Sequence, residues 1–211
     1  MNPTQQRAVM AFTGLLAAGA AALGVLTSVE AVSTSHGIAA LALLLPLAVA
    51  GSLQVSYQYK GHVDAFDLTE AVLMPVVYLV PGPGAIIIAV AGKLISQLHL
   101  KVAGVKLAFN VAQWGCVAAV VSVVYGRLGS GQGNGRDLLA LAAATVVGMV
   151  CNHAAVAQVI GLASSRPLHV VVREMEAVIV RGWLLASGVN LVFGTLFVAL
   201  AVIAPAAAPL V

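Results

Sequence analysis

The chain has 211 residues, of which 61% are hydrophobic and only 8% are charged, and its formal net charge is +3. Soluble domains carry roughly a quarter charged residues, so this composition excludes a soluble enzyme, a disordered chain and a collagen-like fibre. The apolar residues stand in long unbroken runs rather than in alternation, which also argues against an outer-membrane barrel. We therefore expect an all-α, polytopic membrane bundle that forms one transmembrane domain over residues 1–211.

About seven apolar segments follow one another along the chain. They cover residues 8–28, 37–57, 66–80, 85–98, 107–126, 138–163 and 182–204. The first segment is long enough to cross a bilayer and further segments follow it, so we expect a transmembrane helix rather than a cleaved signal peptide. Residues 168–181 combine an apolar stripe with a charged face at helical spacing, which predicts an amphipathic helix lying in the membrane interface.

Residues 66–98 predict a short helical hairpin that turns at the Pro-Gly-Pro-Gly sequence of 81–84, a break that no helix crosses. Each arm has about 15 residues, or roughly 22 Å of helix. That length is below the roughly 30 Å of the hydrocarbon core, so the hairpin is either a thin spanning one or a re-entrant one.

The basic residues predict the orientation, because Lys and Arg concentrate on the cytoplasmic side of a membrane. With the N-terminus inside, seven of them fall on the inner side and two on the outer side. The inner set is Arg7, Lys60, Lys101, Lys106, Arg166, Arg173 and Arg181, and the outer set is Arg127 and Arg136. We therefore expect a cytoplasmic N-terminus and, after seven passes, a C-terminus outside.

Charged side chains inside the hairpin need partners at membrane depth. Lys93 lies within an apolar run, where a charge costs about 2.5–3.5 kcal/mol, and folding the hairpin brings Glu70 to nearly the same depth. We expect these two residues to pair, either as an ion pair that fixes the hairpin or as a ligand or proton site, with snorkelling to an interface as the alternative. Asp67 shares a face with Glu70 and is expected at the cytoplasmic mouth, where it also suits the positive end of the helix dipole.

Four amide side chains lie on three of the long predicted helices. In lipid such groups either bond across helices as structural glue or line a shared polar pocket for a small molecule. The candidate ligand cavity therefore consists of Asp67, Glu70, Lys93, Asn110, Gln113, Asn152 and Asn190.

Other classes of site have no support in the sequence. The basic residues are scattered, so no nucleic-acid partner is expected. Cys116 and Cys151 lie inside apolar runs, where thiols pack as small hydrophobes, and no Cys/His spacing predicts a metal site. No nucleophile–base set or phosphate-binding loop is visible, so we expect no cofactor and no catalytic activity of the chain by itself.

Several motifs resemble those of a known family. They are the sequence FDLTEA at 66–71, the turn PGP at 81–83 and the element FNVAQ at 109–113. Together they resemble the N-terminal multi-helix membrane sensor regions of bacterial cyclic-di-GMP signalling proteins of the GGDEF and HD-GYP types. The resemblance implies a sensory unit of the bacterial inner membrane with an unknown ligand. The chain contains no such output domain, so it is either a fragment that lacks a last helix and an output domain or a stand-alone relative.

A fainter resemblance is to the substrate-binding S components of energy-coupling-factor transporters, on the acidic start at Asp67, the Gly-Pro turn and Lys93. It implies binding of a vitamin-type small molecule and docking to a partner membrane subunit. Gly14, Ala18 and Ala22 lie four residues apart, a spacing that lets helices approach closely. A homodimer, and a structural subunit without a ligand, are the remaining alternatives.

Overall fold

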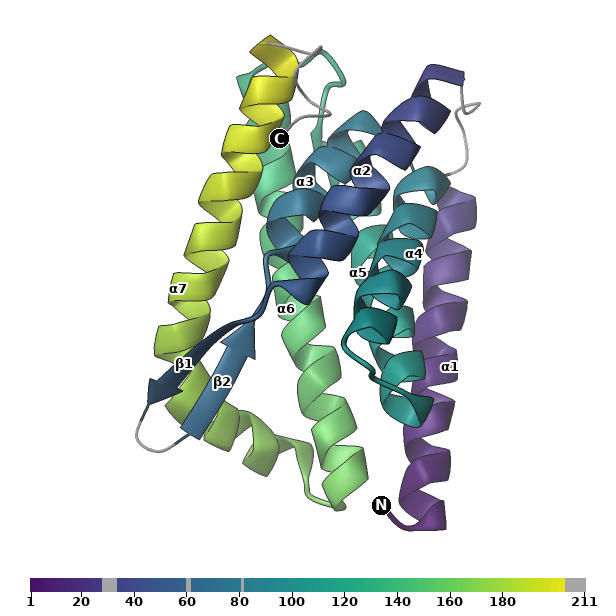
Figure 1. Ribbon diagram of the computed structural model, residues 1–211, viewed down its shortest axis with the longest axis vertical. Coiled ribbons are helices and arrows are strands. Elements are labelled where there is room, and N and C mark those ends of the chain that lie inside the picture. Colours follow the sequence, from purple (N-terminus) through teal and green to yellow (C-terminus); the bar gives the residue numbers. More distant parts are fainter. Residues whose placement is uncertain (28–33, 60–61, 81, 204–211) are drawn as a thin grey trace.

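The computed structural model describes residues 1–27, 34–59, 62–80 and 82–203. Side chains are described in these ranges except at 34–40, 55–59, 62–66, 176–185 and 203. The described part forms seven helices and one β-hairpin (Figure 1). In chain order they are α1 (Pro3–Leu26), α2 (Thr34–Ser52), β1 (Val55–Tyr59), β2 (His62–Phe66), α3 (Thr69–Leu79), α4 (Pro83–His99), α5 (Gly104–Leu128), α6 (Gly135–Ser164) and α7 (Leu168–Ile203).

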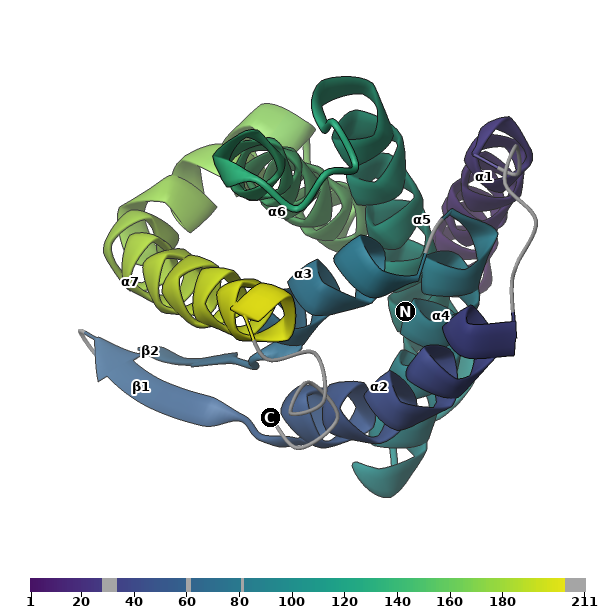
Figure 2. The same ribbon diagram turned by 90° about the horizontal axis from the view of Figure 1, so that it is seen from above.

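The helices form a bundle with α3 in its middle. Seen from above, α2, α4, α5, α6 and α7 surround α3, and all five contact it (Figure 2). The sequence explains this position, because α3 is apolar around its whole circumference and every side chain from Ala71 to Val77 is buried. Leu73, Val76 and Leu141 of the shared core are almost completely inaccessible.

The outer surface of the bundle is apolar. Leu15, Leu41, Leu45, Leu139 and Leu196, from four different helices, are each between 57% and 74% exposed. A soluble protein rarely leaves so much contiguous apolar surface in water, whereas a lipid-facing surface has this composition. The prediction of a helical fold of the membrane type is therefore confirmed.

Three helices of the described part are long and apolar enough to cross a membrane: α1, α5 and α6. They have 24, 25 and 30 residues, which correspond to about 36, 38 and 45 Å. The other apolar helical stretches are shorter: Leu41–Ser52, Thr69–Leu79, Pro83–His99 and Ala186–Val202. The described residues therefore support three candidate spans and do not support the seven that were predicted.

The hairpin predicted at 66–98 exists, with unequal arms. Its first arm, α3, has 11 residues and its second arm, α4, has 17. The turn depends on Gly82, whose φ of +48° favours a residue without a Cβ, followed by Pro83 at the start of α4. The first arm is shorter than predicted because the chain reaches it from β2 and becomes helical only at Thr69.

The β-hairpin was not predicted. Residues 37–57 were expected to form one helix, but α2 ends at Ser52 and the chain then becomes extended. β1 and β2 pair antiparallel, with Val55 opposite Phe66. The sequence VSYQY at 55–59 alternates β-branched or aromatic residues with polar ones, a strand pattern that adjoins the apolar run without a break. The side chains of Tyr57 and Tyr59, expected in an aromatic belt, lie outside the described residues.

The amphipathic stretch at 168–181 is not a separate helix, because α7 continues through it for 36 residues. Its first turns run across the lower end of the molecule before the helix rises (Figure 1). In the described part of this stretch Val171 is buried and Arg173 is exposed, but Leu168 and Val172 of the predicted apolar stripe are exposed as well. Gly182, where the break was expected, does not end the helix.

The two ends of the bundle differ in charge. We call the end with the N-terminus, the α4–α5 turn and the α6–α7 turn the lower end, and the end with the α3–α4 turn and the α5–α6 loop the upper end (Figure 1). The chain positions of the described basic residues place Arg7, Lys101, Lys106, Arg166 and Arg173 at the lower end, and Arg127 and Arg136 at the upper end. This division agrees with the predicted one, apart from Lys60 and the side chain of Arg181, which lie outside the described residues.

Candidate functional site

Asp67, immediately before α3, pairs with Lys93 of α4. The Lys93 Nζ atom lies 2.8 Å from Asp67 Oδ2, and Asp67 Oδ1 accepts a hydrogen bond of 3.0 Å from the backbone N–H of Thr69. Asp67 therefore holds the start of α3, as predicted, and neutralises the buried lysine as well. The side chains of Asp67 and Lys93 are only 16% and 7% exposed, so this pair is shielded from water.

The predicted ion pair between Glu70 and Lys93 is wrong. Folding the hairpin about its turn placed Glu70 and Lys93 at nearly the same depth. Depth alone could not decide whether Lys93 contacts Glu70 or Asp67, because these two residues lie three positions apart on one helix face. Lys93 meets Asp67, which lies nearer the mouth of the hairpin, and Glu70 instead receives hydrogen bonds from amides of other helices.

Lys93 has a second partner in an aromatic ring. Its Nζ atom lies 4.9 Å from the centroid of the Trp114 ring on α5, within the range of a cation–π interaction. Ser96, one turn along α4, donates a hydrogen bond of 3.0 Å to the carbonyl of Lys93. The ammonium group is thus held between a carboxylate and an aromatic face.

Glu70 is held between α6 and α7. Its Oε2 atom accepts a hydrogen bond of 3.0 Å from Asn190 Nδ2, and its Oε1 atom accepts one of 3.5 Å from Asn152 Nδ2. Asn190 also donates to the carbonyl of Asp67 at 3.1 Å and accepts from the backbone N–H of Ala71 at 3.3 Å. This one amide of α7 therefore binds both the backbone at the start of α3 and the carboxylate on its first turn.

Of the two remaining predicted amides, Gln113 bonds to Asn152 and Asn110 does not. Gln113 of α5 donates to the Asn152 carbonyl at 3.2 Å and to the Asn152 side-chain oxygen. Asn110 instead donates to Gln97 of α4, in a contact of its own. Six of the seven predicted residues therefore form one connected set across α3, α4, α5, α6 and α7. We call this set the polar network: Asp67, Glu70, Lys93, Gln113, Asn152 and Asn190.

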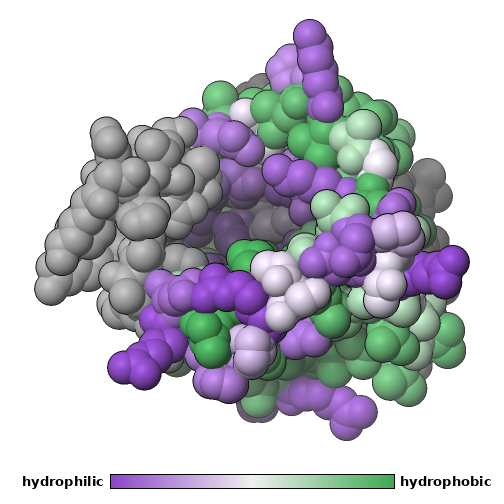
Figure 3. All heavy atoms as spheres, turned by 90° about the horizontal axis from the view of Figure 1, so that it is seen from below, coloured by the Kyte–Doolittle hydropathy of each residue, from purple (hydrophilic) through white to green (hydrophobic). Residues whose placement is uncertain are grey.

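The polar network is only partly buried. Lys93, Gln113 and Asn190 are buried, whereas Asp67, Glu70 and Asn152 keep an intermediate exposure. Figure 3 looks onto the lower end of the molecule, where hydrophilic residues surround a hollow between the helices. The network contains two acidic side chains and one basic side chain, so it has one acid in excess.

Two residues near the network were missed by the sequence analysis. Gln97 is 4% exposed and partners Asn110, and Trp114 partners Lys93. Gln97 lies four residues after Lys93 on the same helix face, and Trp114 directly follows Gln113. Their closeness in the chain to two candidate residues could have identified them.

The polar groups of the network are carboxylates, amides and an ammonium group, which recognise polar or charged groups through hydrogen bonds. Among the residues that the structure describes, no three His, Cys, Asp or Glu side chains are grouped closely enough to hold a metal ion.

No family model, curated protein or solved structure matches the chain. Function is therefore inferred from the site itself.

Proposed function

We propose that the chain is a membrane-embedded sensory domain, non-catalytic by itself, that relays a change at the polar network to the helices that meet there. The single observation that supports this proposal is the connectivity of the network. Glu70 is bonded to α6 through Asn152 and to α7 through Asn190, and Asn152 continues to Gln113 on α5. A small molecule or a proton that engages Glu70 must therefore alter contacts on several helices together.

The packing of α3 against α7 gives the relay a mechanical route. Gly194 of α7 sits against Met74 and the carbonyl of Ala71, so closely that a Cβ at this position would clash with both. Asn190 holds the start of α3 one helical turn away. Because packed helices are displaced as units rather than deformed continuously, a shift at the start of α3 is transmitted to α7.

The proposed location is the bacterial inner membrane, in several passes, with the lower end in the cytoplasm. The excess of basic residues at the lower end supports this orientation. The N-terminus then lies in the cytoplasm, the hollow at the lower end opens towards it, and a seven-pass arrangement places the C-terminus outside.

The relay is tested by measuring distances between two spin labels by double electron–electron resonance, on the full chain in lipid nanodiscs. Spin labels at Leu139→Cys on α6 and Leu200→Cys on α7, two exposed positions, report the separation of these helices after Cys116 and Cys151 are replaced by alanine. Glu70→Gln, which keeps the shape of the side chain and replaces its carboxyl group by an amide, is expected to shift or broaden the distance distribution.

The matched control is Asn110→Leu, which removes a hydrogen-bonded polar side chain that lies outside the network. Its distance distribution is expected to match that of the parent protein. Identical distributions for the parent, Glu70→Gln and Asn110→Leu would contradict the relay.

A second candidate function is that of a substrate-binding subunit of a small-molecule transporter. The observation that favours it is the small-residue stripe on α1, because Gly14, Ala18 and Ala22 are all exposed and no atom lies within 4 Å of a Cβ placed on Gly14. Such a surface suits close packing against another membrane helix. Neighbouring genes for a pair of ATPases and a large membrane subunit would favour the transporter, and an in-frame signalling domain would favour the sensor.

A further inference from the structure

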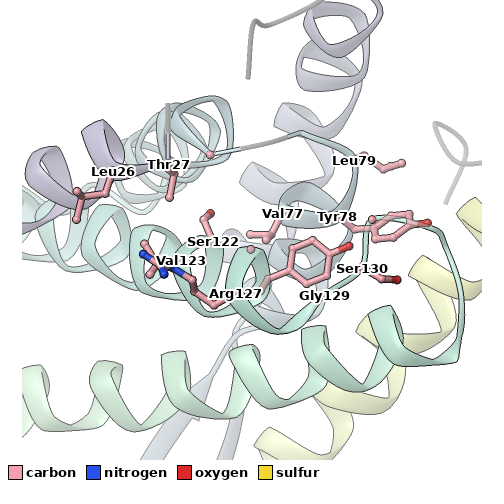
Figure 4. Close-up of a pocket in the computed structure, with 14 residues that line it drawn as sticks. Leu26, Thr27, Val77, Tyr78, Leu79, Ser122, Val123, Arg127, Gly129 and Ser130 are labelled. Atoms are coloured by element: carbon pink, nitrogen blue, oxygen red, sulfur yellow. The ribbon is translucent and has the colours of Figure 1, made fainter. Parts of the chain in front are cut away.

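A pocket of about 620 Å³ lies at the upper end of the bundle. It is enclosed by the ends of α1, α3 and α5, by the α3–α4 turn and by the start of the α5–α6 loop (Figure 4). We call it the upper pocket and define it by six of its lining residues: Thr27, Tyr78, Ser122, Tyr125, Arg127 and Ser130. Its volume is within the roughly 300–1,000 Å³ of small-molecule sites.

One wall of the upper pocket is preformed by a carboxylate. Asp137, at the start of α6, is 1% exposed and accepts hydrogen bonds from the backbone N–H groups of Gly131, Gln132 and Gly133 at 3.0, 2.8 and 2.7 Å. The Ser130 hydroxyl lies 3.1 Å from each of its oxygens. The loop is therefore wrapped around a fixed anion and holds its shape without a ligand. These donors occupy the Asp137 oxygens, and Asp137 is not among the residues that line the upper pocket.

Ser122 supplies an unused buried polar group. Its side chain is 5% exposed, it lines the upper pocket, and its Oγ atom has no hydrogen-bond partner in the described part of the chain. Buried hydroxyls in proteins nearly always have a partner. Figure 4 shows Ser122 and Arg127 directed into the space that Leu26 and Thr27 close on the other side. An acceptor group placed there would satisfy the Ser122 hydroxyl.

Arg127 is the charged side chain among the residues that line the upper pocket. Arg127 lines it and forms no ion pair with any carboxylate of the described residues. Gly82, the N-cap of α4, also lines it, and no side chain caps the first turn of this 17-residue helix. The free N–H groups and the dipole at a helix start favour an anion. Arg127, Ser122 and the start of α4 thus favour a negative group in the same pocket.

Aromatic side chains supply the remaining contact surface. The rings of Tyr78 and Tyr125, from α3 and α5, have centroids 6.4 Å apart and are tilted by 57°. Val77 and Leu79 add apolar surface beside them. A ligand that fits this lining has a flat or apolar body as well as its negative group.

We propose that the upper pocket binds a small anion with an aromatic or apolar body, with the negative group on Arg127 and Ser122 and the body against Tyr78 and Tyr125. This site is additional to the polar network and lies at the other end of the bundle. The anion is either a water-soluble carboxylate or phosphate ester, or the headgroup of an anionic lipid, which share this chemistry.

The test is isothermal titration calorimetry on the full chain in phosphatidylcholine nanodiscs. Benzoate and phenyl phosphate are the anionic probes, and benzyl alcohol and benzylamine are the neutral and cationic probes of similar size. At least one anionic probe is expected to bind at least 10-fold more tightly than the other two. Arg127→Gln is expected to weaken that binding about 10-fold or more, and Ser122→Ala about 3-fold, since Arg127 supplies a full positive charge and several N–H donors whereas Ser122 supplies one neutral hydroxyl.

The matched control is Arg136→Gln, which removes the same charge from the same end of the molecule. The Nε atom of Arg136 donates to the Leu128 carbonyl, and Arg136 is not among the residues that line the pocket. Its affinity is expected to stay within about 2-fold of the parent value, and thermal unfolding of each variant establishes that it is folded.

A second titration identifies the source of the anion. If nanodiscs that contain phosphatidylglycerol weaken the binding of the probes to the parent protein but not to Arg127→Gln, the occupant is a lipid headgroup. If they have no effect, the occupant is a soluble anion. The proposal is overturned if neither the anionic probes nor phosphatidylglycerol bind, if benzylamine binds as tightly as benzoate, or if Arg127→Gln and Arg136→Gln weaken binding equally.

Discussion

The polar network and the α5–α6 loop use buried carboxylates in opposite ways. At the network, Asp67 and Glu70 bind side chains that come from three other helices, α4, α6 and α7. In the loop, Asp137 is surrounded by backbone N–H groups that lie within seven residues of it in the chain. The first arrangement ties distant elements together, whereas the second fixes one local turn. Substitutions in the network should therefore act across the bundle, and substitutions at Asp137 should act locally.

The largest effect is expected for Asp67→Asn. It leaves the Lys93 ammonium without a counter-charge in a nearly inaccessible position, and breaking a buried pair costs about 3–5 kcal/mol. The measurement is the free energy of unfolding in an SDS titration of the detergent-solubilised protein. Adding Lys93→Met to Asp67→Asn is expected to recover most of the loss, and a double variant no more stable than Asp67→Asn would argue against the pair.

A smaller and local effect is expected for Asp137→Asn. An amide cannot accept the full set of N–H donors as a carboxylate does, and hydrogen bonds to a charged group contribute about 1.5–3 kcal/mol. Amide hydrogen exchange should accelerate at Gly131 and Gly133, while protection at the start of α3 should stay unchanged. Equal acceleration in both regions would remove the distinction between a local and a long-range carboxylate.

Single substitutions of the network amides should be milder. Hydrogen bonds between membrane helices contribute on average about 0.6 kcal/mol and at most about 1.7 kcal/mol. Gln113→Leu is expected near the average. Asn190→Leu is expected near the upper limit, because this residue bonds both the α3 backbone and Glu70. The same SDS titration measures both, and a reversed order would contradict the central place given to Asn190.

The smallest effect is expected for the exposed pair of Arg166 and Glu174 at the lower end. The hydrogen bond from Arg166 holds the pKa of Glu174 below its ordinary value. The stabilisation that this pair contributes is thus present above the ordinary pKa of a glutamate and is lost as the pH falls through the lowered one. Solvent screening makes exposed pairs weak, so Glu174→Gln should leave the unfolding midpoint unchanged at physiological salt. An unfolding midpoint clearly below that of the parent at neutral pH, with the difference vanishing at low pH, would show that the pair is shielded from solvent.

Much of the helical fold could be predicted from the sequence, because apolar runs and the Pro-Gly turn leave the chain few alternatives in lipid. The ends of α5 and α6 lie within a few residues of the predicted ones. The β-hairpin was missed because its strand pattern at 55–59 is continuous with an apolar run, and hydropathy does not separate the two. Helix length was harder to predict than helix presence, since seven apolar segments gave three candidate spans among the described residues.

The sequence predicted which residues belong to the site better than it predicted which of them contact one another. Polar residues inside apolar runs are few, so six of the seven candidates joined one network. Which carboxylate meets Lys93 depends on side-chain direction, which the spacing of Asp67 and Glu70 does not fix. Ser122 gave no signal at all, because a single serine in an apolar helix usually bonds a carbonyl of its own helix, as Thr145 does.

The central claim is that the polar network acts as one unit, and a double-mutant cycle between Gln113→Leu and Asn190→Leu tests it most directly. No hydrogen bond joins these two residues in the structure, and they are connected through Asn152 and Glu70. The account predicts that the free energy of unfolding of the double variant departs from the sum of the single effects by at least about 0.5 kcal/mol. Additivity within about 0.3 kcal/mol would show that the amides are independent contacts, and would contradict the relay.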